Sequence, residues 1–79
     1  MEKELARYVA RESFKASSQI SNLVLLLKEH CEEDEYQIFL KSIALVSATI
    51  GEEILSKIYS QYPELEKEIE TQIKKYGVL

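Results

Sequence analysis

Cysteine, proline and glycine are all scarce in this chain of 79 residues. The single cysteine, Cys31, cannot form an internal disulfide, and one cysteine with one histidine is too few for an ordinary zinc site. One proline and two glycines, without an Asn-Gly or Asp-Gly turn dipeptide, leave little with which to build β-hairpins. A chain this small without a covalent or metal staple needs either a tightly packed helical core or apolar surface from a second copy. Self-association is therefore the first hypothesis.

Long hydrophobic runs are also missing. The longest runs from Leu23 to Leu27, five residues, whereas a membrane-spanning helix needs about 20. No basic leader with an apolar region and a small-residue cleavage site is present, so we expect a cytoplasmic protein without a membrane span. Hydrophobic residues make up 46% of the sequence, which excludes a disordered tail.

Positive charge is in the minority, with 10 Lys and Arg against 14 Asp and Glu and a net charge of -4. This balance argues against a general polyanion binder, because nucleic-acid affinity comes largely from cations that neutralise phosphates. One local exception is a basic row of residues that recur every fourth position beside Phe14. It could bind phosphates, a partner protein or the acidic segment of a second copy, or it could simply be solvated. The row consists of Lys3, Arg7, Arg11 and Lys15.

Helical periodicity is clear in the first part of the chain, from about residue 2 to residue 30. With about 100° per residue, six apolar residues fall on one face, as in a helix packed along its length. Phe14 and Leu25 lie on the opposite face and predict a second contact surface, unless they are two isolated exposed side chains. The six residues are Leu5, Val9, Ala16, Ile20, Leu23 and Leu27.

The block from about 35 to 60 has two apolar faces, which predicts a central helix that is buried on two sides. A row of small residues between the faces, Ala44, Ser47, Ala48 and Gly51, would allow close approach of another helix. The rival interpretation breaks the helix at Gly51, because Thr49 and Glu52 fit a capping box. We favour continuity, since glycine inside a helix costs only about 1 kcal/mol against alanine.

The two faces of this central helix have different members. One consists of Tyr36, Phe39, Ile43, Val46, Ile50 and Ile54, and the other of Ile38, Leu45, Ala48, Leu55 and Tyr59. We expect the dimer or close-packing surface on the second face together with the small residues, that is, at Leu45, Ala44, Ser47, Ala48, Gly51, Leu55 and Tyr59.

The remaining segments predict a turn and a third helix. The acidic run from Cys31 to Glu35 supplies the turn, and its carboxylates suit the start of the next helix. Pro63 begins a helix over about 63–76. Gly77 is expected to adopt the left-handed cap conformation, with Val78 available for the hydrophobic contact that often accompanies it.

Candidate chemistry is weak. Glu12, His30 and Glu52 interrupt apolar stripes, but di-iron sites in helical bundles use a Glu-x-x-His pair, which the sequence lacks. Cys31 and His30 are adjacent and so point about 100° apart on a helix. The acidic surroundings of Cys31 should raise its pKa and make the thiol unreactive. We expect no enzyme, no metal and no cofactor.

The sequence thus predicts one all-α domain over residues 1–79, a long antiparallel two-helix hairpin with a shorter C-terminal helix. Two such hairpins would pair as a homodimer into a four-helix-like bundle. The expected function is that of a small cytoplasmic, non-catalytic protein that acts through protein-protein interaction. The alternative is a helical regulator associated with nucleic acid through Lys3, Arg7, Arg11 and Lys15.

Overall fold

The all-α class is confirmed in a computed structural model that describes residues 1–77 and 79. The described residues contain no strand. The elements are α1 (Lys3–His30), α2 (Glu33–Ile50), a π-helical turn η1 (Gly51–Leu55), α3 (Ser56–Gln61) and α4 (Glu64–Tyr76).

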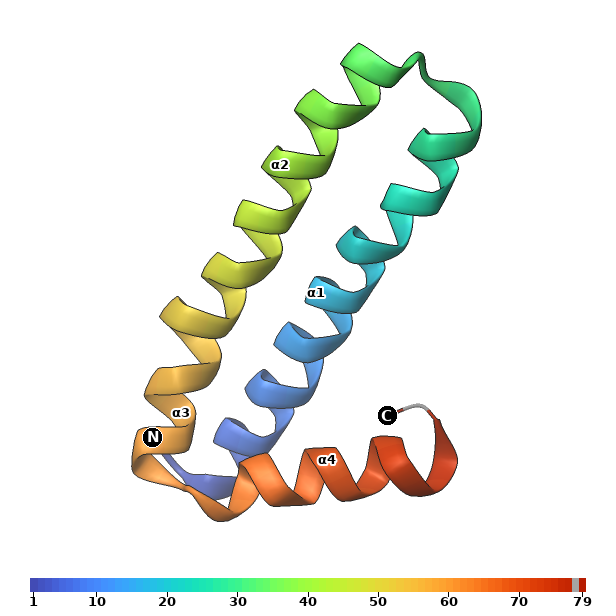
Figure 1. Ribbon diagram of the computed structural model, residues 1–79. Helices are drawn as coiled ribbons and strands as arrows, with labels where there is room; N and C mark the ends of the chain where they lie inside the picture. Colours follow the sequence, from blue (N-terminus) through green and yellow to red (C-terminus); the bar gives the residue numbers. More distant parts are fainter. Residues whose placement is uncertain (78) are drawn as a thin grey trace.

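The long hairpin is confirmed as well. Helices α1 and α2 lie side by side and run in opposite directions, and α3 continues the line of α2 (Figure 1). Helix α4 turns away after Pro63 and crosses the open end of the hairpin near the start of α1 (Figure 1). The helix bounds differ from the expected ones by one or two residues, which is the ordinary uncertainty of helix ends.

The helix ends follow from their sequences. Glu33, Asp34 and Glu35 occupy the first turn of α2, where their carboxylates oppose the positive end of the helix dipole. At the other end of the chain Gly77 has φ 76°, and its N–H donates to the Ile73 carbonyl at 2.7 Å. The left-handed cap is therefore confirmed at Gly77, while the expected contact of Val78 lies outside the described residues.

A regular set of side chains, which we call the seam, joins the two halves of the hairpin. Between Ser18 and Ile50, where every residue is described, all half-buried residues belong to the seam and all others are exposed. On α1 the seam positions follow one another in alternating steps of four and three residues, as in a coiled coil. The seam consists of Ala6, Ala10, Ser13, Ser17, Ile20, Val24 and Leu27 on α1 with Cys31 directly after it, and of Tyr36, Leu40, Ile43, Ser47, Ile50, Leu55, Ile58 and Tyr62 on the returning arm.

The central helix stays helical through Gly51, which has φ −63° and ψ −46°. Continuity at this glycine is confirmed, but the expected face that joins Ile50 to Ile54 is wrong, because the chain makes one π-helical turn from Gly51 to Leu55. Such a turn inserts one residue into the helical repeat. The seam therefore steps by five residues, from Ile50 to Leu55, before it resumes its three-four pattern at Ile58.

The π turn determines which side chains reach the core. An uninterrupted α-helix would continue the four-three steps from Ile50 to Ile54, Lys57 and Gln61. With one extra residue the same face presents Leu55, Ile58 and Tyr62 instead, and Ile58 is 5% exposed. The turn thus exchanges a lysine and a glutamine for apolar side chains.

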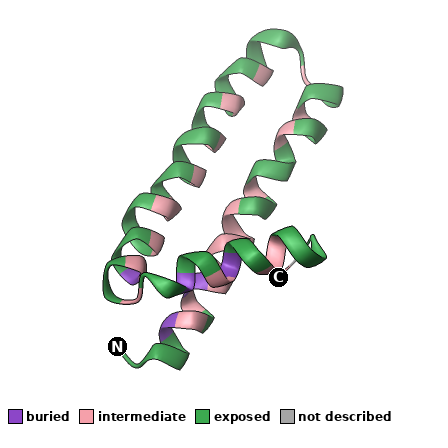
Figure 2. Ribbon diagram, turned by 60° about the horizontal axis from the view of Figure 1, so that its bottom comes forward, coloured by how far each residue is buried: buried purple, intermediate pink, exposed green. Residues whose placement is uncertain are grey.

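The core is small and lies where α4 crosses the hairpin. Among the described residues, the buried side chains come from α1, α3 and α4 only (Figure 2). Two alanines of α1 in this cluster are fully buried and lack bulk, which lets Leu65 and Ile69 of α4 pack close to the hairpin. The buried residues are Ala6, Ala10, Ile58, Leu65 and Ile69.

Away from this cluster the hairpin is one layer of helices. The chain measures 45 × 26 × 15 Å along its principal axes, and a single helix with side chains is about 10 to 12 Å thick. Towards the turn both helices carry only exposed and half-exposed residues (Figure 2). The far half of the hairpin therefore has no second layer within the described chain.

Candidate interaction surfaces

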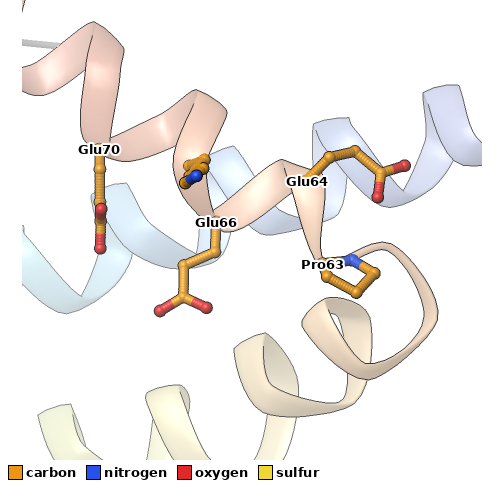
Figure 3. A pocket seen from close by; sticks show the side chains of 5 residues that line it. Pro63, Glu64, Glu66 and Glu70 are labelled. Carbon is orange, nitrogen blue, oxygen red and sulfur yellow. The ribbon is translucent and has the colours of Figure 1, made fainter.

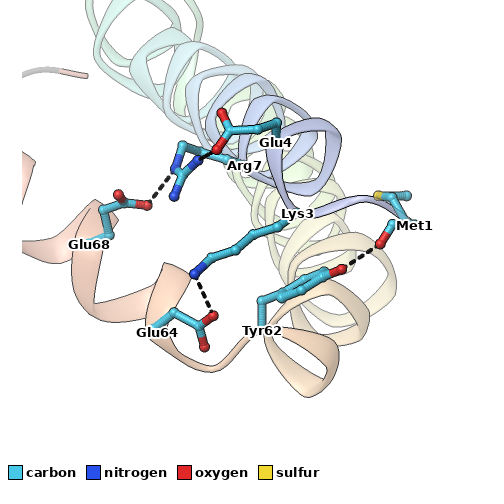
Figure 4. Close-up of polar contacts among 7 residues, drawn as sticks. All are labelled: Met1, Lys3, Glu4, Arg7, Tyr62, Glu64 and Glu68. Carbon is cyan, nitrogen blue, oxygen red and sulfur yellow. Dashed lines mark hydrogen bonds and ion pairs between the residues drawn. The ribbon is translucent and has the colours of Figure 1, made fainter.

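The basic row of α1 faces the glutamates of α4. Lys3 Nζ lies 2.8 Å from Glu64 Oε1, and Arg7 Nε donates to Glu68 Oε2 at 2.9 Å (Figure 4). Arg7 also bonds Glu4 within its own helix. These contacts join the first two turns of α1 to the first two turns of α4 and orient α4 across the hairpin.

The other two members of the row are engaged more loosely. Arg11 Nη2 donates to the Leu79 carbonyl at 3.0 Å, and Lys15 Nζ lies 3.7 Å from Glu12 Oε1. The row therefore does not form an unpaired cationic stripe. Each of its four side chains has a carboxylate or carbonyl partner within this chain.

The pKa shifts at this contact agree with the pairing. The hydrogen bond from Lys3 is the main cause that lowers the pKa of Glu64, and hydrogen bonds to Glu68 and then Glu4 raise the pKa of Arg7. Both shifts favour the charged forms. No observation thus favours phosphate binding by Lys3, Arg7, Arg11 and Lys15: the first two hold α4, Arg11 bonds the Leu79 carbonyl, and Lys15 pairs with Glu12.

Helix α4 also covers the aromatic end of α3. Burial is the main cause that raises the pKa of the Tyr59 hydroxyl, and the carboxylates of Glu66 and Glu70 add to it. Nearby, the Tyr62 hydroxyl donates to the Met1 carbonyl and ties the start of the chain to the end of α3 (Figure 4). Tyr59 and Leu55 are half-buried against the core cluster, Tyr59 beside the carboxylates of α4 and Leu55 in the seam, so these two members of the expected dimer surface are already partly covered within the chain.

The two residues singled out as a second contact surface have different surroundings. Phe14 packs against the core cluster, and it lines a groove of about 680 Å³ with Lys15, Asn22 and Ile73, between α1 and the end of α4. Leu25 lies on the same side of α1, eleven residues further along the helix than Phe14, and is 69% exposed. The structure therefore does not bring Phe14 and Leu25 together.

The members of the row of small residues have different surroundings within one chain. Ser47 lies in the seam, where its hydroxyl oxygen is 2.7 Å from that of Ser17 and 2.9 Å from that of Ser21. Ala44 and Ala48 are exposed on the side of the hairpin where α4 lies. Leu45, at 69% exposure, points away from α1 altogether.

Gly51 gains no close neighbour. A Cβ atom built on it would meet no described atom within 4 Å, apart from its own helix backbone. No described segment of this chain thus approaches Gly51 closely, and its place in a dimer or close-packing surface stays a prediction.

The side of the hairpin opposite α4 carries a surface that we call the open face. Its residues occupy the positions directly before the seam positions on α1 and α2. In two antiparallel right-handed helices, positions with the same offset from the seam point to the same side of the pair. The open face has seven apolar members, and α4 lies on the other side, against Arg7, Arg11 and Phe14, which directly follow seam positions. The seven are Leu5, Val9, Ala16, Leu23, Leu26, Phe39 and Val46.

The far half of the open face is its most apolar part. Leu23, Leu26, Phe39 and Val46 are each between 47% and 54% exposed, and they come from adjacent levels of α1 and α2. The other side of the hairpin at this level is mostly polar, with Leu25 among Asn22, Lys28, Gln37 and Lys41. These four lie on the same face as the polar Gln19 and Ser42, and a mainly apolar patch of this kind on a small protein marks a contact surface.

A shallow hollow of about 480 Å³ lies at the start of α4 between Pro63, Glu66 and Glu70 (Figure 3). Its lining has one lysine, Lys67, against three glutamates, the third being Glu64. Negative charge at the start of a helix suits the helix dipole, so the acidic hollow is accounted for by helix stability.

The residues weighed for chemistry lie apart. Glu12 is exposed and pairs with Lys15, while His30 and Glu52 are exposed. A hydrogen bond with Glu35 raises the pKa of the Cys31 thiol, as its acidic surroundings predicted. In the part of the chain that the structure describes, no three His, Cys, Asp or Glu side chains are grouped so that they could hold a metal ion.

A search of the described helices for a membrane span found none that combines sufficient length with sufficient apolar character. Comparison of the chain with protein-family models, with curated proteins and with solved structures gave no match.

The open face was not singled out from the sequence, although its signal was there. The stripe expected on the first helix contains Leu5, Val9, Ala16 and Leu23, all of which lie on the open face. These four are displaced by one residue from the seam, which has an alanine, a serine or Val24 next to them, whereas the other two members of the stripe, Ile20 and Leu27, lie in the seam. The displacement itself indicates that the most apolar side of α1 is turned away from α2.

Proposed function

We propose that the protein is a small cytoplasmic, non-catalytic protein that acts by binding another protein chain through the open face. The observation that carries this proposal is the contrast between the small buried cluster under α4 and the apolar open face. A single-layer hairpin buries one side of each helix, and a stable domain normally covers the other apolar side with a second layer.

The charge distribution supports a protein partner rather than a nucleic acid. The cations Lys3 and Arg7 are paired with α4, and the net charge of -4 repels a polyanion. The far half of the open face, around Leu23, Leu26 and Val46, is mainly apolar. Such a surface recognises apolar side chains of another protein, as in the pairing of helical hairpins.

Site-specific photo-crosslinking in cells tests the proposal. A photoreactive phenylalanine analogue replaces Leu26 on the open face in one version and Leu45 on the outer edge of α2 in the other. Leu45 is the control position, because it is also a leucine and is more exposed than Leu26, at 69% against 54%. We expect a defined crosslinked protein, identified by mass spectrometry, from position 26 only. Equal products from both positions, or none from position 26, would contradict the proposal.

A further inference from the structure

The amount of exposed surface indicates how large a contact is missing. The chain exposes 5899 Å². A compact monomer of 9.2 kDa is expected to expose about 4,900 Å², so the excess is about 1,000 Å². One partner in a protein interface of standard size buries about 800 Å². The excess thus equals about one side of a specific protein interface.

The shape of the chain locates this excess in the hairpin. Its radius of gyration is 14.7 Å, whereas a compact chain of this length is expected to have about 11.6 Å. The short axis of 15 Å leaves room for one layer of helices. A second hairpin of the same dimensions, laid on the open face, would make the two-layer bundle that helical domains of this kind form.

The open face meets the requirement of self-pairing. A two-fold symmetric contact uses the same surface patch on both chains. A charged residue near the symmetry axis would therefore face its own copy and be repelled. The far half of this face holds Leu23, Leu26, Phe39 and Val46, and apolar groups of this kind can pair with themselves if the two far halves meet. Helix α4 lies on the other side of the hairpin and leaves the face unobstructed.

Charge determines the relative direction of the two copies. The turn of the hairpin carries four consecutive acidic residues, from Glu32 to Glu35, all exposed. Parallel pairing would place the two turns side by side and bring eight carboxylates together, which costs free energy through like-charge repulsion. Antiparallel pairing places the two turns at opposite ends of the bundle.

We propose that the partner is a second copy of this chain, docked open face to open face, with the two hairpins antiparallel in a four-helix bundle and an α4 on each outer side. This inference specifies the partner in the proposed function and so rests on it. Because the dimer is symmetric, each exposed leucine of the open face is buried in both copies.

The first test compares two variants of the full chain by sedimentation velocity. Leu26→Asp places a charge in the far half of the open face, and Leu45→Asp places the same charge on the outer edge of α2. Both side chains are more than half exposed in the single chain, so neither substitution removes a core contact. We expect the parent and Leu45→Asp to be dimers, and Leu26→Asp to have a dimer Kd raised by about 100-fold or more. Circular dichroism should show unchanged helicity.

The second test measures direction on the parent sequence with a spin label on Cys31, the only cysteine. Pairing through the far half places the two-fold axis near the level of Leu23, eight residues or about 12 Å along the helix from Cys31, so antiparallel pairing separates the two labels by roughly 25 to 35 Å. Parallel pairing would leave them within roughly 10 to 20 Å, one or two helix diameters. A short distance would overturn the antiparallel arrangement.

The failure of this inference and the failure of the proposed function give different results. A monomeric parent, or a dimer that Leu45→Asp dissociates as readily as Leu26→Asp, would overturn self-pairing. If position 26 nevertheless crosslinks to a different protein, the open face remains an interaction surface with another occupant. If position 26 captures neither a second copy nor any other protein, both proposals are wrong.

Discussion

Ser17 on α1 and Ser47 on α2 are hydrogen-bonded to each other across the hairpin, with 2.7 Å between their hydroxyl oxygens. Each hydroxyl also approaches the backbone carbonyl of the other serine, at 3.4 Å from Ser17 and 3.3 Å from Ser47. A short side chain that reaches the backbone of the facing helix requires the two helices to be close. The serine pair therefore marks the point at which larger side chains would not fit.

This contact predicts opposite outcomes for two neighbouring substitutions. Ser47→Leu should lower the free energy of unfolding by about 1 to 3 kcal/mol, because a larger side chain in a packed contact forces the helices apart. Ala48→Leu should change it by less than about 0.5 kcal/mol, because Ala48 is exposed and leucine is a good helix former. Urea titration followed by circular dichroism measures both. Equal destabilisation by the two substitutions would show that the seam is placed wrongly.

The π turn makes a deletion tolerable at one place. Removing Glu53, which is exposed, should convert Gly51–Leu55 into regular α-helix and leave Leu55, Ile58 and Tyr62 in the seam, four, seven and eleven positions after Ile50. The melting temperature should stay within a few degrees of the parent. Removing Ala44, also exposed, rotates the following part of the arm by about 100° and should cause a loss of several kcal/mol, because Ile58 leaves the core.

Thermal melts of the two deletions, monitored by circular dichroism, check this prediction. The deletions are matched, since each removes one exposed residue from the same helical arm. If both variants unfold at similarly reduced temperatures, the extra residue is not absorbed by the π turn.

Gly51 should be replaceable by alanine with a gain in stability. Its backbone is α-helical, and a Cβ atom would meet no described atom within 4 Å outside its own helix backbone. Gly51→Ala should therefore raise the free energy of unfolding by up to about 1 kcal/mol. The midpoint in urea measures the gain. A marked loss would mean that the π turn needs glycine.

The pairing of Lys3 with Glu64 predicts a dependence of stability on pH. The folded pKa of Glu64 is lowered from 4.5, so unfolding takes up protons at acid pH. Its stabilising contribution is fully present above pH 4.5 and is lost as the pH falls through the lowered folded value. Lys3→Met should reduce the urea midpoint near neutral pH, and the difference from the parent should shrink below pH 4.5. A difference independent of pH would exclude this ion pair as its cause.

The architecture could be predicted from the sequence because local signals agreed. Pro63 and Gly77 bound the last helix, and the acidic run after Cys31 starts the second. These residues act within one or two turns of their own position, where capping, dipole and backbone preference are strong. The order of the helices and the hairpin follow from them.

The packing faces could not be predicted in the same way. Hydrophobic periodicity finds the most apolar side of a helix, and on α1 that side includes Leu23 on the open face as well as Leu27 in the seam. The closest contact between the arms instead uses Ser17 and Ser47, since small residues allow close approach. Nor does periodicity reveal the residue inserted by the π turn at Gly51. Both apolar faces of this block have an apolar residue after Gly51, Ile54 on one and Leu55 on the other, so the pattern fits a regular helix as well.

The central claim is that the open face is covered in solution, and hydroxyl-radical footprinting of the intact chain tests it most directly. Leu26 and Leu45 are the same residue type and differ little in exposure in the single chain, at 54% and 69%. Mass spectrometry then reports the oxidation rate at each. We predict that oxidation of Leu26 falls several-fold as the protein concentration rises through the dimer Kd, while that of Leu45 stays constant. Parallel oxidation of both leucines at every concentration would contradict the account.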